Sequence, residues 1–241
     1  MKYAIQFITL FALVFTVNSA LATRGKPPPA PEPGLLNVVT VSPQYGDYTS
    51  PVDALNSITN AAEDNQYVIQ IGPGVYDIGY AQIKMESWVK IEGAGRSFTV
   101  IKGSRASYAD DNEAAMVIGA DHAALTSVGI ENTGDGLLYS IGIRNDNASP
   151  AIKTVKVTVV GSVNNEGISN HNDSHPTIQN VVTLSGTGIV ANNSAPFILD
   201  SRLSGYSKGL KLTDSPDSRV VNNMIIGGVE VVGVVLSVTP T

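Results

Sequence analysis

The sequence predicts an all-β protein, a right-handed single-stranded parallel β-helix (a solenoid) with an N-terminal capping α-helix. The first observation is a repeat in the second half of the chain, where a Gly and an apolar residue precede a Pro-containing turn and a short apolar segment. Successive copies lie about 20 to 26 residues apart, the period of a solenoid with one coil per repeat. The second observation is that short apolar runs alternate with turn signals and not with helices, which argues against a β/α fold. The copies begin at Gly142, Gly167, Gly188 and Gly209, and their prolines are Pro150, Pro176, Pro196 and Pro216.

The start of the chain reads as an export signal followed by a spacer. Residues 1–22 are interpreted as a signal peptide, because Lys2 precedes an apolar run and Ala20-Leu21-Ala22 offers small residues for cleavage. Residues 23–34 form a Pro-rich linker, a composition that favours extended chain over packing. The β-helix domain is expected to span 35–241. We therefore expect a protein that is secreted, held at the cell surface or periplasmic.

Composition limits the classes of partner. The chain holds 15 Lys and Arg against 21 Asp and Glu, a net charge of −6, and its basic residues are not clustered. Binding of nucleic acid depends on cations that neutralise phosphate, so nucleic acid is not an expected partner. Apolar stretches after the signal are interrupted by polar residues, so no membrane span is expected.

The elements follow in order from Leu36. A Val-rich first strand is predicted over 36–41, and one amphipathic helix over 51–63, with Ser50 as the N-cap and Pro51 at the first helical position. Its place before the first coil would cover the exposed edge of the solenoid. Short strands are then predicted at 67–71, 88–91 and 99–101.

Aligning the repeats predicts columns of residues that face the interior. The members of one column are Ile152, Ile178, Ile198 and Val221, and those of the next are Thr154, Asn180, Asp200 and Asn223. A polar column of this kind indicates a ladder of hydrogen bonds at the coil corners. At the far end, Val229 to Val238 is Val-rich and nearly uncharged, which predicts either pairing with another chain or a truncated solenoid.

Four segments carry a family resemblance that covers Val39 to Gly103, about a quarter of the chain. They are Gly46-Asp47-Tyr48-Thr49-Ser50, Ile71-Gly72-Pro73-Gly74-Val75-Tyr76, Val89-Lys90-Ile91-Glu92-Gly93 and Thr99-Val100-Ile101-Lys102-Gly103. In order and spacing this region resembles the opening coils of the pectin-lyase-like right-handed parallel β-helix proteins, and most closely the pectinesterase family. The resemblance implies the fold. It also implies an ester hydrolase that uses two aspartates, glutamines for the oxyanion and an arginine that orients the nucleophile.

The family's catalytic positions are not matched in this chain. Tyr139 stands where the resemblance places an oxyanion Gln. The segments at the two aspartate positions are Gly161-Ser162-Val163-Asn164-Asn165 and Gly188-Ile189-Val190-Ala191-Asn192, neither of which holds a carboxylate. The pectinesterase catalytic set is therefore predicted to be missing.

Other residues remain candidates for a site. Asp110, Asp111 and Glu113 offer oxygen ligands suited to calcium. No cofactor is expected to be required, and calcium is the one ion that these residues could bind. Asp110 or Asp111 together with Arg144 could alternatively serve catalysis. The candidates for ligand binding are Tyr108, Tyr139, Arg144, His171 and His175.

Three functions stay open at this point. The leading hypothesis is a secreted protein that binds a polysaccharide or surface glycan, or serves as a surface or matrix component, without pectinesterase catalysis. The first alternative is a polysaccharide-active enzyme, either a pectinesterase-like esterase with displaced acids or a calcium-assisted lyase resembling pectate lyase. The second is an assembly element that associates through its Val-rich end.

Overall fold

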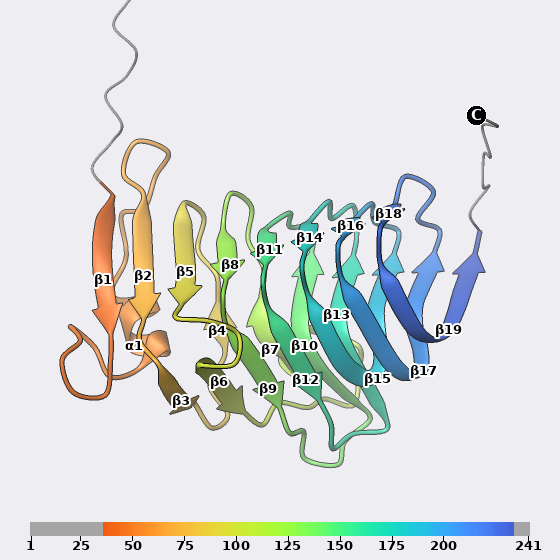
Figure 1. Cartoon of the computed structure of the whole chain (residues 1–241), viewed down its shortest axis with the longest axis horizontal. Coiled ribbons are helices and arrows are strands. Elements are labelled where there is room, and N and C mark those ends of the chain that lie inside the picture. The colour runs from red at the N-terminus through yellow and green to blue at the C-terminus, as the bar shows by residue number, and fades with distance from the viewer. Residues whose placement is uncertain (1–35, 234–241) are drawn as a thin grey trace, which may run out of the picture. The chain divides into compact units, whose positions relative to one another are not determined.

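The computed structural model describes residues 36–233, which form a stack of coils whose strands pair in parallel from one coil to the next (Figure 1). The prediction of a parallel β-helix is thus confirmed. The predicted signal peptide and linker, 1–22 and 23–34, lie outside the described residues. Within the described part, no helix is long and apolar enough to cross a membrane.

One wall of the stack is an eight-stranded sheet to which each coil contributes one short strand. Its strands, in spatial order, are β1 (Asn37–Val41), β2 (Tyr67–Ile71), β5 (Val89–Gly93), β8 (Ala124–Thr126), β11 (Ala151–Lys153), β14 (Thr177–Gln179), β16 (Phe197–Leu199) and β18 (Arg219–Val221).

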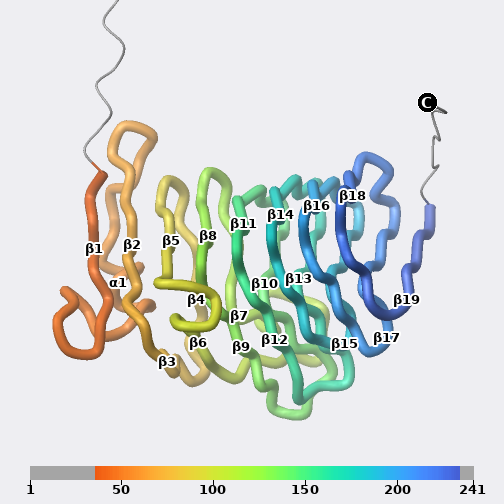
Figure 2. Tube along the Cα trace, viewed as in Figure 1, coloured from red at the N-terminus to blue at the C-terminus, as the bar shows by residue number. Residues whose placement is uncertain are grey.

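The remaining walls belong to a second, continuous sheet that bends around the interior. One limb holds β3 (Gly74–Asp77), β6 (Thr99–Gly103), β9 (Gly129–Asn132) and β12 (Lys156–Val159), and the other holds β4 (Ile83–Lys84), β7 (Ala115–Ile118), β10 (Tyr139–Asp146) and β13 (Asn164–His171). The long strands β15 (Val182–Asn192), β17 (Arg202–Thr213) and β19 (Met224–Val232) run through both limbs. The tube in Figure 2 follows their bend, where the pairing register shifts between Ser185 and Thr187.

The core consists of aliphatic columns that run through the stack. Ile152, Ile178 and Ile198 pair in register and are fully buried, as predicted. The last member of this column is Val220 and not Val221, so the prediction was wrong by one residue in the final coil. Each fully buried Ile contributes about 2 kcal/mol of hydrophobic stabilisation.

The repeated glycines that revealed the period form a column of their own. A Cβ on Gly167 would overlap the carbonyl oxygen of Gly188, and a Cβ on Gly188 would overlap that of Gly209. Only a residue without a side chain lets adjacent coils approach this closely. Close coil packing is therefore the physical cause of the repeat.

The polar column lies at the coil corners, as the ladder interpretation requires, but its members do not face inward. Thr154, Asn180, Asp200 and Asn222 all have left-handed backbones, with φ between 52° and 56°. Asn and Asp tolerate this conformation because their short side chains bond locally. Asn180 donates to the Thr154 hydroxyl at 3.3 Å, and Asn222 donates to the Asp200 carboxylate at 2.7 Å. Asn222 replaces the predicted Asn223, which is the same one-residue slip.

The helix begins as predicted and ends early. Helix α1 spans Pro51–Asn56 and packs against β1, β2 and β4, with the Ser50 hydroxyl accepting from the Asp53 amide at 3.4 Å. The predicted continuation to Glu63 was wrong. Asn60 explains the early end: its carbonyl accepts from Asn65 Nδ2 at 2.7 Å and its side chain from the Tyr67 hydroxyl at 2.8 Å, so its polar groups are engaged outside a helix.

A short 3-10 helix, η1 (Asn112–Ala114), ends an excursion from the coils. The excursion runs from Ser104 to η1 and covers part of β10. Two backbone bonds between Ser107 and Tyr139, 3.0 and 2.9 Å long, attach it to the start of that strand. This attachment decides what lies over the outer surface of β10 and β13.

Candidate functional site

The candidate site lies on the outer surface of two neighbouring strands, β10 and β13. The register places Arg144 beside Ser169, Ile141 beside Glu166 and Asp146 beside His171. Because side chains alternate across a strand, Arg144 and Asp146 share one face of β10 while Asn145 takes the other.

The inward residues hold this alternation in place. Asn145 and Asn170 are fully buried, and Asn145 donates to the side-chain oxygen of Asn170 at 2.8 Å. Asn170 in turn donates to the carbonyl of Val190 at 2.9 Å. A buried amide without partners costs free energy, so this ladder opposes a register slip that would turn Arg144 inward.

Asp110 reaches the strands from the excursion above them. The Ser140 hydroxyl and the Asn132 amide donate to the carbonyl of Arg105, at 2.9 Å each. The Arg105 guanidinium pairs with Glu113 at 2.6 Å across the excursion. These bonds add to the Ser107–Tyr139 pairing and hold the acidic segment over Arg144.

Arg144 is the centre of the cluster. Its side chain is only 6% exposed and bonds to the carboxylates of Asp110 and, at 3.4 Å, Asp146. His171 Nε2 lies 3.6 Å from the second carboxylate oxygen of Asp110 and 2.8 Å from the Ser169 hydroxyl. A charge-assisted bond to a buried guanidinium holds Asp110 in one orientation.

Glu166 is the second carboxyl group of the cluster and behaves differently. Burial raises its pKa to about 7, and the negative charge of Asp110 adds to this, while the Ser169 hydroxyl, Arg144 and Lys211 act in the opposite direction. Its Oε2 atom is inaccessible and has no hydrogen-bond partner among residues 36–233. Glu166 therefore keeps a proton close to neutral pH, partly because it lies beside the carboxylate of Asp110.

His171 remains neutral over most of the physiological range. Burial lowers its pKa first and Arg144 second, while Asp110 and Asp146 partly oppose these effects. A neutral imidazole offers one acceptor nitrogen, and the contact with Ser169 or with Asp110 depends on the tautomer.

One group of residues in the described part places possible cation ligands close together. One oxygen of Asp110, one of Glu166 and a ring nitrogen of His171 lie within 4.8 Å of one another. A carboxylate–imidazole set of this kind suits a transition metal better than calcium, which prefers oxygen alone. The adjacent Arg144 guanidinium disfavours a second cation at this place.

The structure separates the remaining candidates from this cluster. Asp111 caps η1, accepting from the Glu113 amide at 3.1 Å and from the Ser107 hydroxyl at 3.2 Å. The Glu113 carboxylate pairs with Arg105, so the three acids predicted to bind calcium do not converge, and calcium binding stays a prediction.

The aromatic and second histidine candidates are also elsewhere. Tyr108 is 73% exposed on the excursion, and Tyr139 packs against Ala114, Ala115 and Ile141. His175 is exposed and pairs with Asp173 at 3.0 Å, so the two histidines face different surroundings. Of the predicted site residues, the structure brings together Asp110, Arg144 and His171.

Sequence reasoning missed Glu166 and Asp146, although the repeat held the signal. Asp146 and His171 each stand four residues after the repeated Gly, and Arg144 and Ser169 stand two residues after it. Glu166 immediately precedes Gly167, as Ile141 precedes Gly142. Extending the alignment to these outward positions would have placed a second acid one coil from Arg144.

The arrangement combines an ionised carboxylate held by a guanidinium with a neighbouring carboxyl group that retains its proton. Two titratable groups whose environments separate their pKa values are the usual basis for assigning an acid and a base. A guanidinium is protonated at any physiological pH, so Arg144 acts as a cation and cannot be the base. Fold and cluster together define a parallel β-helix protein with a carboxyl pair on its outer surface.

Solved structures similar to this chain include several pectin methylesterases. The enzyme from Aspergillus niger is 11% identical with a TM-score of 0.49, and covers 86% of each chain. The enzyme from carrot is 15% identical with a TM-score of 0.47, over 74% of this chain and 72% of its own. The enzyme PemA from Erwinia chrysanthemi is 15% identical with a TM-score of 0.42, and the match covers 77% of this chain and 66% of the enzyme. No protein-family model matches the chain, and comparison with curated protein sequences finds no match.

Proposed function

We propose that this chain is a secreted hydrolase that cleaves ester groups carried by a polysaccharide. The observation that carries the proposal is the pairing of Asp110, bonded to Arg144, with Glu166, whose pKa is raised to about 7. Ester hydrolysis by carboxylates needs an ionised nucleophile and a separate proton donor. The family resemblance supports the polysaccharide substrate, and the apparent signal peptide supports secretion.

The roles follow from the two environments. The Asp110 carboxylate, whose side chain is 31% exposed, attacks the ester carbonyl. Protonated Glu166 gives its proton to the departing alcohol, which leaves an acyl–Asp110 anhydride. Ionised Glu166 then takes a proton from water as the water attacks the anhydride. This releases the acid and restores both carboxyl groups to their starting forms.

The same geometry weighs against the calcium-assisted lyase. The lyase considered above combines calcium and Asp110 or Asp111 with Arg144, but Asp111 caps η1 and Glu113 pairs with Arg105, so these acids do not gather around a cation. Arg144 contacts two carboxylates and, as a guanidinium, cannot accept a proton. The displaced-acid esterase is therefore the better supported enzyme alternative.

The test is release of alcohol or acid from methyl-esterified and acetylated polysaccharides by the purified protein. Asp110→Asn should reduce turnover by about a thousandfold, because the nucleophile is lost with little change in shape. Glu166→Gln should reduce it by about a hundredfold or more, the usual contribution of a general acid. Asp217→Asn is the matched control, since Asp217 is exposed in the turn of the last coil and its loss should leave turnover unchanged.

Three results would contradict the proposal. Binding of the polymers without release of product would support the leading hypothesis from the sequence, a binding protein. Release of reducing ends without alcohol or acid would indicate a glycosidase, which can also use two carboxyl groups. Full activity of both Asp110→Asn and Glu166→Gln would show that the cluster only attaches the excursion to the strands.

A further inference from the structure

A second polar region lies at the corner of the coils, away from the cluster on β10 and β13. It is a groove of about 660 Å³ between the end of the eight-stranded sheet's strands and the start of β15, β17 and β19. Its lining includes three members of the corner ladder, Asn180, Asp200 and Asn222, and two arginines, Arg96 and Arg202. The hydrolysis proposed above uses none of these residues.

Arg96 enters the groove from a distant part of the chain. It lies in the turn between β5 and β6, and its Nη1 donates to the carbonyl of Asn180 at 3.0 Å and to the Asn180 side chain at 3.4 Å. This bond spans 84 residues of sequence. Only one of the guanidinium's terminal nitrogens is engaged with Asn180, so the others keep donors for a ligand.

Arg202 supplies the second cation. It is exposed at the first position of β17, and within residues 36–233 it forms no ion pair. Arg202 and the Asn180 that Arg96 contacts belong to adjacent coils, which rise about 4.8 Å apart. A polymer running along the stack would therefore meet the two guanidinium groups in succession.

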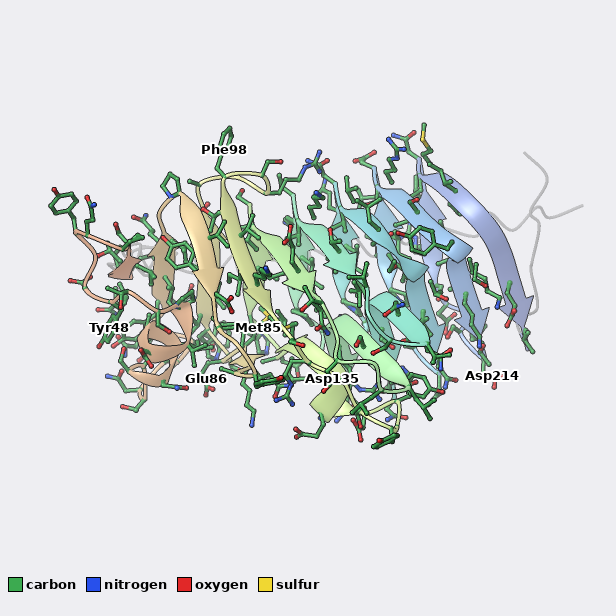
Figure 3. All side chains as sticks on the ribbon, turned by 90° about the horizontal axis from the view of Figure 1, so that it is seen from below. Tyr48, Met85, Glu86, Phe98, Asp135 and Asp214 are labelled. Carbon is green, nitrogen blue, oxygen red and sulfur yellow. The ribbon has the colours of Figure 1, made fainter. Side chains whose placement is uncertain are left out.

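The rest of the lining suits hydroxyl groups. Asp200 uses one carboxylate oxygen to accept from Asn222, which leaves its second oxygen without a hydrogen-bond partner among the described residues. Phe98, in the same turn as Arg96, is 70% exposed and projects away from the ribbon (Figure 3). Apolar rings stack against sugar faces, while hydroxyl groups bond to carboxylates and amides.

The charges define the ligand further. Two arginines and one aspartate make the groove locally positive in a chain of net charge −6. Guanidinium groups bind carboxylates through paired N–H donors, so a polymer that carries carboxylates along its length is the ligand that these charges favour. The other described groove, of about 420 Å³ beside β1, β2 and β5, holds Glu92 and no arginine or lysine.

We propose that the groove lined by Arg96, Asn180, Asp200 and Arg202 binds the carboxylate groups of a uronic acid polysaccharide and anchors it along the coils. This is a binding site separate from the proposed hydrolytic cluster. It needs no turnover, because a polymer without ester groups should bind equally well.

The test is calorimetric titration of the whole protein with oligogalacturonate, and with the same oligosaccharide after reduction of its carboxyl groups to alcohols. Arg202→Gln should weaken binding of the acidic oligosaccharide by about tenfold, because it removes a guanidinium group. Arg96→Lys should also weaken binding, because a lysine cannot donate two parallel hydrogen bonds to one carboxylate. Binding should also weaken as salt concentration rises. Arg219→Gln is the matched control, because Arg219 lies over the Phe197 ring, outside the groove.

Each outcome bears on the site itself. Because the probe has no ester, failure of the hydrolase assignment leaves the result unaffected. Equal binding of acidic and reduced oligosaccharides, unchanged affinity of Arg202→Gln, or an equal loss in Arg219→Gln would each overturn the proposal. Arg202 is exposed, so Arg202→Gln should unfold at the same temperature as the natural chain, which separates lost binding from lost folding.

Discussion

At the scale of single residues, the cluster on β10 and β13 shows how neighbours assign different protonation states to similar groups. Asp110 bonds to a buried guanidinium, whereas Glu166 lies one coil further on with a carboxyl oxygen that has no hydrogen-bond partner among the described residues. Burial and the nearby charge of Asp110 favour the neutral form of Glu166. The two acids therefore differ because of position and not because of residue type.

Glu166 predicts how the stability of the protein depends on pH. Its pKa in the folded chain, about 7, is above the ordinary value of 4.5, so the folded state binds this proton more tightly than the unfolded state. The free energy of unfolding should therefore fall as pH rises from about 4.5 to about 7, by at most roughly 3 kcal/mol. Chemical denaturation of the natural chain and of Glu166→Gln across this range measures the difference, which the variant should abolish.

His171 provides the internal check on this experiment. Its lowered pKa acts in the opposite direction, so its contribution to stability is lost as pH falls below the ordinary value of 6.5. Glu166→Gln keeps this second dependence. If the variant retained the loss of stability between pH 4.5 and 7, the buried carboxyl group would not be its cause.

At the scale of elements, the glycine column explains why the repeat is regular where it is. Strands β10, β13, β15 and β17 each contain one of the repeated glycines, and the Cα of this glycine lies close to the next coil. The apolar residue after each glycine enters the core, where Ile143, Ile168 and Ile189 are fully buried. The Gly–apolar pair thus combines close approach of the coils with burial of a side chain.

Gly167→Ala should destabilise the protein by about 3 kcal/mol, because the added methyl group overlaps the backbone of Gly188 and neither strand can move without disturbing its neighbours. Gly72→Ala is the matched control. Its Cβ would meet no atom closer than 3.4 Å, an ordinary contact, and its backbone is not left-handed. Thermal unfolding of the two variants compares them, and equal stability would mean that the coils can separate to admit a side chain.

At the scale of the whole molecule, the two ends of the described stack differ. Helix α1 packs against the first strands, with Ala54 and Leu55 buried. The last coil leaves apolar side chains accessible on β18 and β19. The exposed members are Val220, Val221, Met224, Ile226, Val229, Val231 and Val232.

Self-association through this apolar coil stays a prediction. Residues 234–238 of the Val-rich segment lie outside the described residues. Sedimentation velocity should show oligomers that increase with protein concentration. Replacing Val229 and Val231 with Lys should weaken association by about tenfold or more, since charge is poorly tolerated in an apolar contact. Val163→Lys is the control, because Val163 is 73% exposed in a distant loop. A strict monomer at all concentrations would exclude assembly through this coil.

The sequence by itself determined the parallel coils, the start of the helix, the inward aliphatic column and the corner ladder. These features are periodic, and a coil contacts only its neighbours, so local spacing is enough to place them. It misjudged where the helix ends, because the bonds of Asn60 to Asn65 and Tyr67 arise only once β2 is in place. It also shifted the last coil by one residue, where two adjacent valines suit the column equally well.

The tertiary structure alone decided the site. The sequence offered Asp110, Arg144 and His171 only as separate candidates and did not indicate Glu166, and the acids implied by the family resemblance were missing at the matched positions. Folding brings Asp110 over Arg144 through the pairing of Ser107 with Tyr139, and places Glu166 one coil away. The physical reason is that burial and charge at a point depend on every segment that reaches it, and an excursion from the coils follows no period.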